Sequence, residues 1–189
     1  MRTIRNQFRV ALILSVATVL LAGCSATKNN AADFSKADLM FAQMMIPHHK
    51  QAIEMSDLAL EISENPEIVS LARRIKKAQA PEIEQMQLWL DTGDAGHMGH
   101  DMMDDFDEAS DGMMGMLDDG EFTELQNATG IEFDRLFLKG MIAHHEGAID
   151  MADMVVGSEN KEAAALGQSI IDTQKAEIEE MRTLLASIS

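Results

Sequence analysis

Residues 44–55 read MMIPHHKQAIEM, and residues 140–151 read GMIAHHEGAIDM. The shared core is Met-Ile-x-His-His-x-x-Ala-Ile-[Glu/Asp]-Met, and the second copy follows the first by 96 residues (45 to 141). Four of the six histidines of the chain lie in these two stretches. An internal repeat of this kind indicates that one structural unit occurs twice in the chain.

Apolar residues and histidines recur at intervals of four and three around both copies, as they do along one face of an α-helix. The first stripe is Phe41, Met45, His48, Ala52, Met55 and Ala59, and the second is Phe137, Met141, His144, Ala148, Met151 and Val155. Each copy is followed by a segment that reads Gln-x-x-Glu-Ile-Glu-x-Met, at residues 79–86 and 174–181. The sequence therefore predicts two matched helical hairpins, which bury their apolar stripes by pairing with each other.

We expect an all-α protein, a four-helix bundle built from two repeated helical hairpins with a long Met/His/Asp-rich crossover between them. The bundle domain is predicted at residues 35–189, with the first hairpin at 35–91, the connection at 92–128 and the second hairpin at 129–187. A short helix is expected within 119–128.

Several helix ends carry sequence signals. Ser35 with Asp38 resembles a capping box, and Asn65 followed by proline is typical of a helix start. Pro47 and Pro81 fall inside helical stripes, where they are predicted to kink the helices. A helix that begins only at Pro47 is the alternative, and the apolar period upstream disfavours it. The third long helix is predicted to begin near residue 129 and to be closed by residues 157–158, and the fourth to span 159–187.

The N-terminal residues 1–23 are typical of a bacterial lipoprotein signal peptide. Three arginines precede an apolar run at residues 10–20, and Leu21-Ala22-Gly23-Cys24 resembles a lipobox, which implies cleavage before Cys24 and a lipid on that cysteine. An ordinary secretory signal is the alternative. Residues 24–34 are interpreted as a tether. We therefore expect a chain anchored by lipid in the bacterial cell envelope, facing the periplasm or the outside.

Composition narrows the class of partner. The formal net charge is −17, so a nucleic acid would be repelled and cations are favoured. Methionine occurs 16 times, whereas the chain has one cysteine, Cys24, which is the predicted site of the lipid. Any soft metal ligand in the bundle must therefore be methionine or histidine.

Methionine and histidine share helix faces in both repeats, because residues three and four apart are neighbours on a helix. Thioether sulfur suits Cu(I) and Ag(I), and imidazole suits several transition metals. Structural zinc would normally recruit cysteine, and calcium a cluster of oxygens. The pattern thus predicts copper, with Cu(I) favoured and Cu(II) or Ag(I) as alternatives. The candidate ligands by this reasoning are Met44, Met45, His48, His49, Met55, Met141, His144, His145 and Met151.

The two members of each His-His pair should differ in position. Adjacent residues point about 100° apart on a helix. His48 and His144 fall on the core stripe, and His49 and His145 lie on its shoulder, toward a neighbouring helix. Glu82 and Glu177 are interpreted in three ways: as surface acids, as carboxylate ligands, or as groups that orient the imidazoles.

The connection between the hairpins carries further candidate ligands among glycines and aspartates. These are His97, Met98, His100, Met102, Met103, Met113, Met114 and Met116. A connection of this length is usually functional or disordered. We favour metal capture, and the alternative is an acidic connection whose methionines have no role.

The doubled Met-Ile-x-His-His-x-x-Ala-Ile-x-Met motif, together with its Gln-x-x-Glu-Ile-x-x-Met helices, resembles domain-of-unknown-function family 305. The better-known members of that family are the CopM-like copper proteins. The resemblance covers about residues 35–187 and implies a ferritin-like bundle, secreted or anchored to the envelope, that binds copper through Met and His in copper tolerance. It carries over Met45, His48, His49, Met55, Met141, His144, His145 and Met151, and through the paired helices Met86 and Met181.

The leading functional hypothesis is a copper-binding lipoprotein without enzymatic activity that sequesters or hands on the metal. Metal ions are its expected partners, together with a copper donor or acceptor protein and a second copy of the chain. A di-iron oxidase is the enzymatic alternative, although no Glu stands three residues before any of the four motif histidines. A structural bundle with buried, hydrogen-bonded histidines is the third hypothesis.

Overall fold

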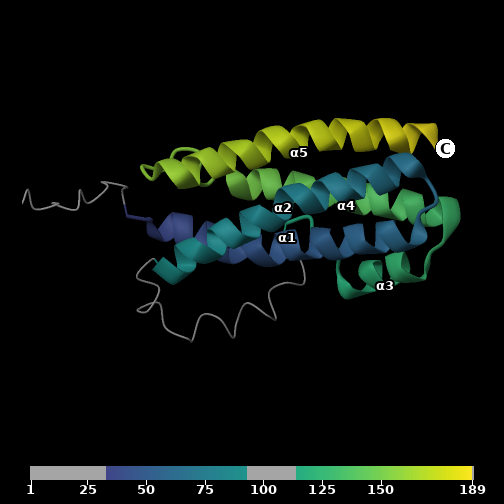
Figure 1. Cartoon of the computed structure of the whole chain (residues 1–189), viewed down its shortest axis with the longest axis horizontal. Coiled ribbons are helices and arrows are strands. Elements are labelled where there is room, and N and C mark those ends of the chain that lie inside the picture. The colour runs from purple at the N-terminus through teal and green to yellow at the C-terminus, as the bar shows by residue number, and fades with distance from the viewer. Residues whose placement is uncertain (1–32, 93–113, 189) are drawn as a thin grey trace, which may run out of the picture. The chain divides into compact units, whose positions relative to one another are not determined.

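The computed structural model describes residues 33–92 and 114–188 and consists there of helices without strands (Figure 1). The helices are α1 (Lys36–Ile62), α2 (Pro66–Thr92), α3 (Asp119–Asn127), α4 (Gly130–Ala152) and α5 (Lys161–Ser187). In these residues no helix is both long and apolar enough to cross a bilayer. The predicted signal peptide, most of the tether and residues 93–113 of the connection lie outside the described residues.

The predicted start signals are confirmed. The Ser35 hydroxyl accepts a hydrogen bond from the Asp38 amide (3.2 Å), and the Asp38 carboxylate accepts one from the Ser35 amide (2.7 Å). Helix α2 begins at Pro66 as expected, directly after Asn65. Helix α1 begins at Lys36 and continues through Pro47, so the alternative start at Pro47 is wrong.

The third long helix is shorter than predicted. Helix α4 ends at Ala152, and residues 153–157 form turns instead of continuing the helix to Gly157. This end of the helix packs closely on α5, where a Cβ at Gly167 would lie 2.8 Å from the Val155 side chain and 3.0 Å from the Ala152 carbonyl oxygen. Helix α5 then starts after Asn160, within two residues of the predicted start, and the Asn160 side chain accepts hydrogen bonds from two backbone amides.

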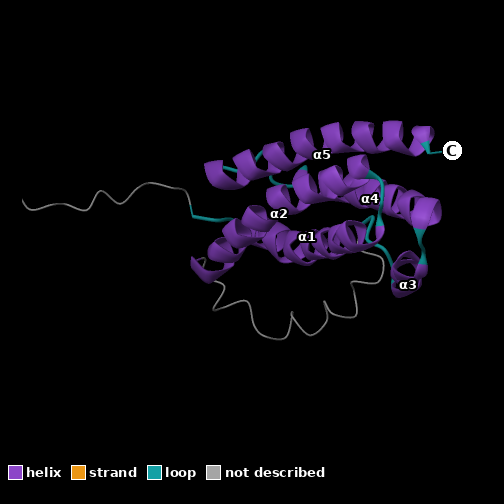
Figure 2. Cartoon of the chain, turned by 45° about the vertical axis from the view of Figure 1, so that its right-hand side comes forward, coloured by secondary structure: helices purple, strands orange, loops and turns teal. Residues whose placement is uncertain are grey.

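The four long helices form two hairpins, α1 with α2 and α4 with α5, and the hairpins meet mainly through α1 and α4 (Figures 1 and 2). The predicted four-helix bundle is therefore confirmed. One buried cluster joins the first half of α1 to the second half of α4, and the other joins the second half of α1 to the first half of α4. Helices α1 and α4 thus run antiparallel, and the bundle has two hydrophobic cores instead of one.

The contribution of the core to stability is tested by replacing leucine with alanine at two positions of α2, one buried and one exposed. Leu71 is fully buried, whereas Leu88 is 61% exposed. We expect Leu71→Ala to lower the free energy of unfolding by about 2–5 kcal/mol, because it removes buried methyl groups and leaves a cavity. Leu88→Ala should change it by less than about 0.5 kcal/mol. Urea unfolding followed by circular dichroism measures both, and equal losses would contradict the placement of α2.

Candidate metal centre

The four motif histidines form a polar layer between the two hydrophobic clusters. All four side chains are fully buried. On α1 the layer separates Met45 and Ile46 of one cluster from Ala52 of the other, and on α4 it separates Met141 from Ala148. The repeated motif therefore interrupts the apolar core at its middle, where polar groups need partners.

The rings of His48 and His144 meet at the centre of this layer. Their centroids are 3.7 Å apart, with an angle of 40° between the ring planes. His49 and His145 lie further out, at 6.5 Å and 6.3 Å from the ring before them in the sequence. The predicted difference between the two members of each pair is thus what the structure shows.

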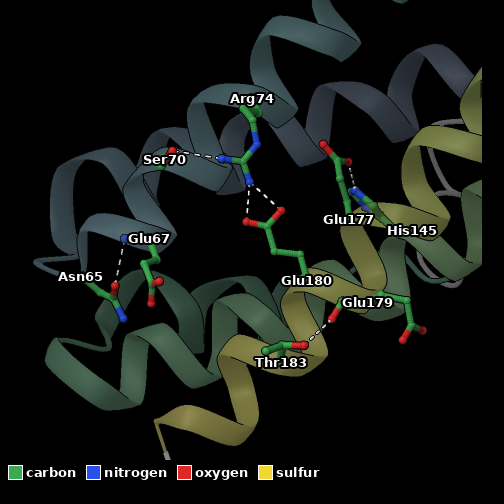
Figure 3. Close-up of polar contacts among 9 residues, drawn as sticks. All are labelled: Asn65, Glu67, Ser70, Arg74, His145, Glu177, Glu179, Glu180 and Thr183. Carbon is green, nitrogen blue, oxygen red and sulfur yellow. Dashed lines mark hydrogen bonds and ion pairs between the residues drawn. The ribbon is translucent and has the colours of Figure 1, made fainter.

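The outer histidines each bind a glutamate of the neighbouring helix in their own hairpin. His49 Nε2 lies 2.8 Å from Glu82 Oε2 of α2, and His145 Nε2 lies 2.8 Å from Glu177 Oε2 of α5. Figure 3 shows His145 pointing toward Glu177, one turn before Glu180, which pairs with Arg74 of α2. Of the three interpretations of Glu82 and Glu177, these contacts fit the one in which each glutamate orients an imidazole. The role of the two glutamates toward a metal stays a prediction.

Three of the four imidazoles use the same nitrogen in these contacts. His48 Nε2 lies 3.0 Å from the carbonyl oxygen of Met114, and His49 and His145 use Nε2 toward their glutamates. Carbonyl and carboxylate oxygens accept, so Nε2–H is the donor in each of these three contacts. A histidine that binds a metal ion through one ring nitrogen commonly donates a hydrogen bond from the N–H of the other.

The free nitrogens are part of a larger set of unpartnered atoms. Among the described residues, the buried side-chain atoms of this region without a hydrogen-bond partner in the protein are Nδ1 of all four histidines, His144 Nε2, and both amide atoms of Gln79 and Gln174. Each unsatisfied buried polar group costs about 1–3 kcal/mol. The layer therefore has donor and acceptor capacity that a bound cation and its ligands would use. The sequence motif contained both glutamines, but reasoning from the sequence gave them no role.

Burial keeps the inner histidines neutral. It lowers the pKa of His48 to about 3, helped by the neighbouring His49 and opposed by the Met114 carbonyl. Burial also holds the pKa of His144 well below its ordinary value, and the charge that His48 would carry acts in the same direction. A neutral imidazole is the form that binds a metal ion, since its nitrogen lone pair is free.

The predicted methionine ligands lie on both sides of the layer. Met45, Met86 and Met151 belong to the cluster on one side, and Met55, Met141 and Met181 to the cluster on the other. All six are at most 1% exposed, and Met44 is partly buried beside the first cluster. The repeat explains this arrangement, because equivalent methionines of the two hairpins fall in opposite clusters.

The candidates in the connection divide into two groups. His97, Met98, His100, Met102, Met103 and Met113 lie outside the described residues. Met114 is 44% exposed, and Met116 is partly buried. The contact of the Met114 backbone with His48 was not predicted, because sequence reasoning considered only the side chain of that residue.

The comparison with protein families agrees with this geometry. The family described as Domain of unknown function (DUF305) matches residues 38–185, most of the chain. The chain belongs to the DUF305 family. The resemblance drawn from the doubled motif is thereby confirmed. No curated protein matches the chain.

Solved structures of DUF305 proteins share the fold. A DUF305 protein of Streptomyces coelicolor, described as secreted, is 30% identical, with a TM-score of 0.68 over 80% of this chain and 93% of that one. A DUF305 fragment from Deinococcus radiodurans is 28% identical, with a TM-score of 0.67 over 81% and 97%. CopM in its Cu(I)-bound form is 30% identical, with a TM-score of 0.62 over 79% and 96%. CopM has also been solved with Cu(II) and with silver.

The arrangement does not favour the di-iron alternative. Glu82 and Glu177 each bind one outer histidine of their own hairpin. In residues 33–92 and 114–188, no group of three or more His, Cys, Asp or Glu side chains is placed to hold a metal ion. The buried methionines on both sides of the layer stay candidates for further ligands.

The buried neutral histidines predict a pH dependence of the metal-free chain. Below the ordinary histidine pKa of 6.5, the unfolded chain takes up protons that folded His48, with a pKa of about 3, does not. The free energy of unfolding should fall as the pH falls, by up to about 1.4 kcal/mol per pH unit for each such histidine. Urea unfolding between about pH 7 and pH 4 measures this slope.

The variant His144→Gln isolates the contribution of His144 to this pH dependence, because the carboxylates that also titrate are the same in both chains. The free energy of unfolding of the variant should fall less steeply with falling pH than that of the original chain. Equal slopes would show that His144 titrates normally in the folded protein.

Proposed function

We propose that this chain binds copper, with Cu(I) preferred and Ag(I) as a close substitute, in the histidine layer between its two hydrophobic clusters. The observation that carries the proposal is the common orientation of three imidazoles. His48, His49 and His145 donate Nε2–H to an oxygen and leave Nδ1 without a protein partner, inside a layer that has further unpartnered atoms.

The donor set fits a soft cation. The imidazoles have methionines from three helices in the cluster on each side, and cysteine is absent from the described residues. Thioether and imidazole together favour Cu(I) over harder ions, which prefer oxygen. The solved CopM structures with Cu(I), Cu(II) and silver support the same metals for a relative of this fold.

The proposed biological role is supported by the CopM structures that hold copper or silver and by the charge of the chain. The protein sequesters copper, or passes it to another protein, and so contributes to copper tolerance. The net charge of −17 attracts cations to the surface. The candidate ligands of the connection, residues 97–116, would capture metal before the bundle binds it.

The test compares two methionines of α1 that differ in burial. Met45 is fully buried beside the histidine layer, and Met40 is 43% exposed. Met45→Leu should raise the Cu(I) dissociation constant on the order of tenfold or more, because a soft ligand is lost. The exchange nearly conserves volume, so it should cost less than about 1.5 kcal/mol of stability. Competition with a chromophoric Cu(I) chelator measures the affinity.

Met40→Leu is the matched control and should leave the affinity unchanged. A second pair of variants covers the imidazoles, with His48→Gln and His144→Gln each expected to weaken Cu(I) binding. If Met45→Leu, both histidine variants and Met40→Leu all bind Cu(I) as the original chain does, the metal site is not in this layer.

The chain is held in the bacterial envelope by a lipid on Cys24, within the sequence Leu21-Ala22-Gly23-Cys24. The Streptomyces relative described as secreted supports a location outside the cytoplasm. We expect Cys24→Ser to abolish incorporation of labelled palmitate in bacterial cells and to move the protein out of the membrane fraction. Ser25→Ala is the control. Retention of the label in Cys24→Ser would contradict the lipobox.

A further inference from the structure

The end of the connection crosses the histidine layer as a short strap, residues Met114–Leu117. Its first carbonyl accepts the hydrogen bond from His48 Nε2 at 3.0 Å. Its last residue is held by Gln51, one turn after His48 on α1, which donates to the Leu117 carbonyl (2.8 Å) and accepts from the Leu117 amide (2.9 Å). The strap is therefore fixed at both ends by side chains of α1.

The strap also lies directly on the backbone of α4. A Cβ at Gly147 would overlap the Met114 carbonyl, and a Cβ at Gly115 would overlap the Ala143 carbonyl. Gly115 has φ +77°, a conformation that other residues rarely adopt. At Gly140 a Cβ would lie 3.0 Å from the Leu117 side chain. The approach thus depends on glycine on both the strap and α4.

The repeat provides an internal comparison. Ninety-six residues before Gly140, Ala143 and Gly147, helix α1 has the larger residues Met44, Pro47 and Gln51. Only α4 therefore has the small face on which the strap lies. In the described residues, a strap carbonyl bonds to a ring nitrogen of His48, whereas no strap carbonyl bonds to a ring nitrogen of His144.

We infer that the strap is a positioning element for the metal site: it holds His48 as the Nε2–H tautomer and directs Nδ1 of that ring toward the metal. Gln51, Gly115 and Gly147 are its positioning residues, and Met114 contributes through its backbone carbonyl. This inference rests on the proposed function. It also makes the two repeats unequal, because the strap bonds to the ring of His48 and not to that of His144.

The first measurement uses no metal. Two-bond ¹H–¹⁵N spectra of the full chain labelled with ¹⁵N-histidine report which ring nitrogen is protonated, and His48→Gln identifies the His48 signals. We expect a single Nε2–H tautomer for His48. Gly115→Ala and Gln51→Ala should convert it to a mixture, because each releases one attachment of the strap.

The matched controls should keep the His48 tautomer of the original chain. Gly157→Ala introduces the same side chain where a Cβ meets nothing within 4 Å. Gln168→Ala removes an exposed glutamine that bonds only within its own helix in the described structure. An unchanged His48 tautomer in both Gly115→Ala and Gln51→Ala would overturn the inference.

The second measurement titrates the same chains with Ag(I), a soft ion that does not change oxidation state under these conditions. Gly115→Ala and Gln51→Ala should weaken binding about 10- to 100-fold, as loss of a group that orients a ligand does. Gly157→Ala adds a methyl group away from the strap and should bind Ag(I) as the original chain does. If Gly157→Ala weakens binding as much as Gly115→Ala, the loss does not come from the strap and the inference is wrong.

The two measurements separate the two proposals. If the original chain binds Ag(I) and the strap variants change neither tautomer nor affinity, only the positioning role fails. If the original chain binds neither Ag(I) nor Cu(I), the proposed function fails, and the positioning of a metal ligand fails with it.

Discussion

The structure depends on burying imidazoles in the middle of an apolar bundle. A buried polar group without a partner is expensive, so every helix that meets the layer supplies something to it. The α2 and α5 helices supply Glu82 and Glu177, and the connection supplies a carbonyl. The histidine layer separates the two hydrophobic clusters. Because α1 and α4 run antiparallel, each hairpin contributes its histidines to the same layer.

Much of the fold follows from periodicity. The stripes through His48 and His144 identified the buried faces, and the Ser35 capping box fixed the first helix end to within one residue. The end of α4 was missed, because the stripe continues to Val155, which is buried although it lies in a turn. There the chain packs closely on Gly167 of α5, and a contact between residues far apart in the sequence cannot be predicted from local spacing.

The sequence predicted which residues belong to the candidate site better than it predicted the contacts that they make. Helical geometry placed His49 and His145 toward neighbouring helices, but it did not choose between the roles of the glutamates. The contact of His48 with the Met114 backbone spans 66 residues and uses no side chain of Met114, so no motif contains it. The feature of the sequence that indicates this contact is a difference between the repeats: Gly140, Ala143 and Gly147 have larger counterparts in the first repeat.

That contrast has a consequence for how such a protein arises. In a homodimer of identical hairpins, every substitution appears in both halves, so a glycine that admits a strap on one side also opens the other. Joining the hairpins in one chain removes this restriction, and Gly147 and Gln51 now occupy equivalent positions with opposite tasks. Because both hairpins belong to one chain, the two halves of the histidine layer can therefore differ in sequence and in task.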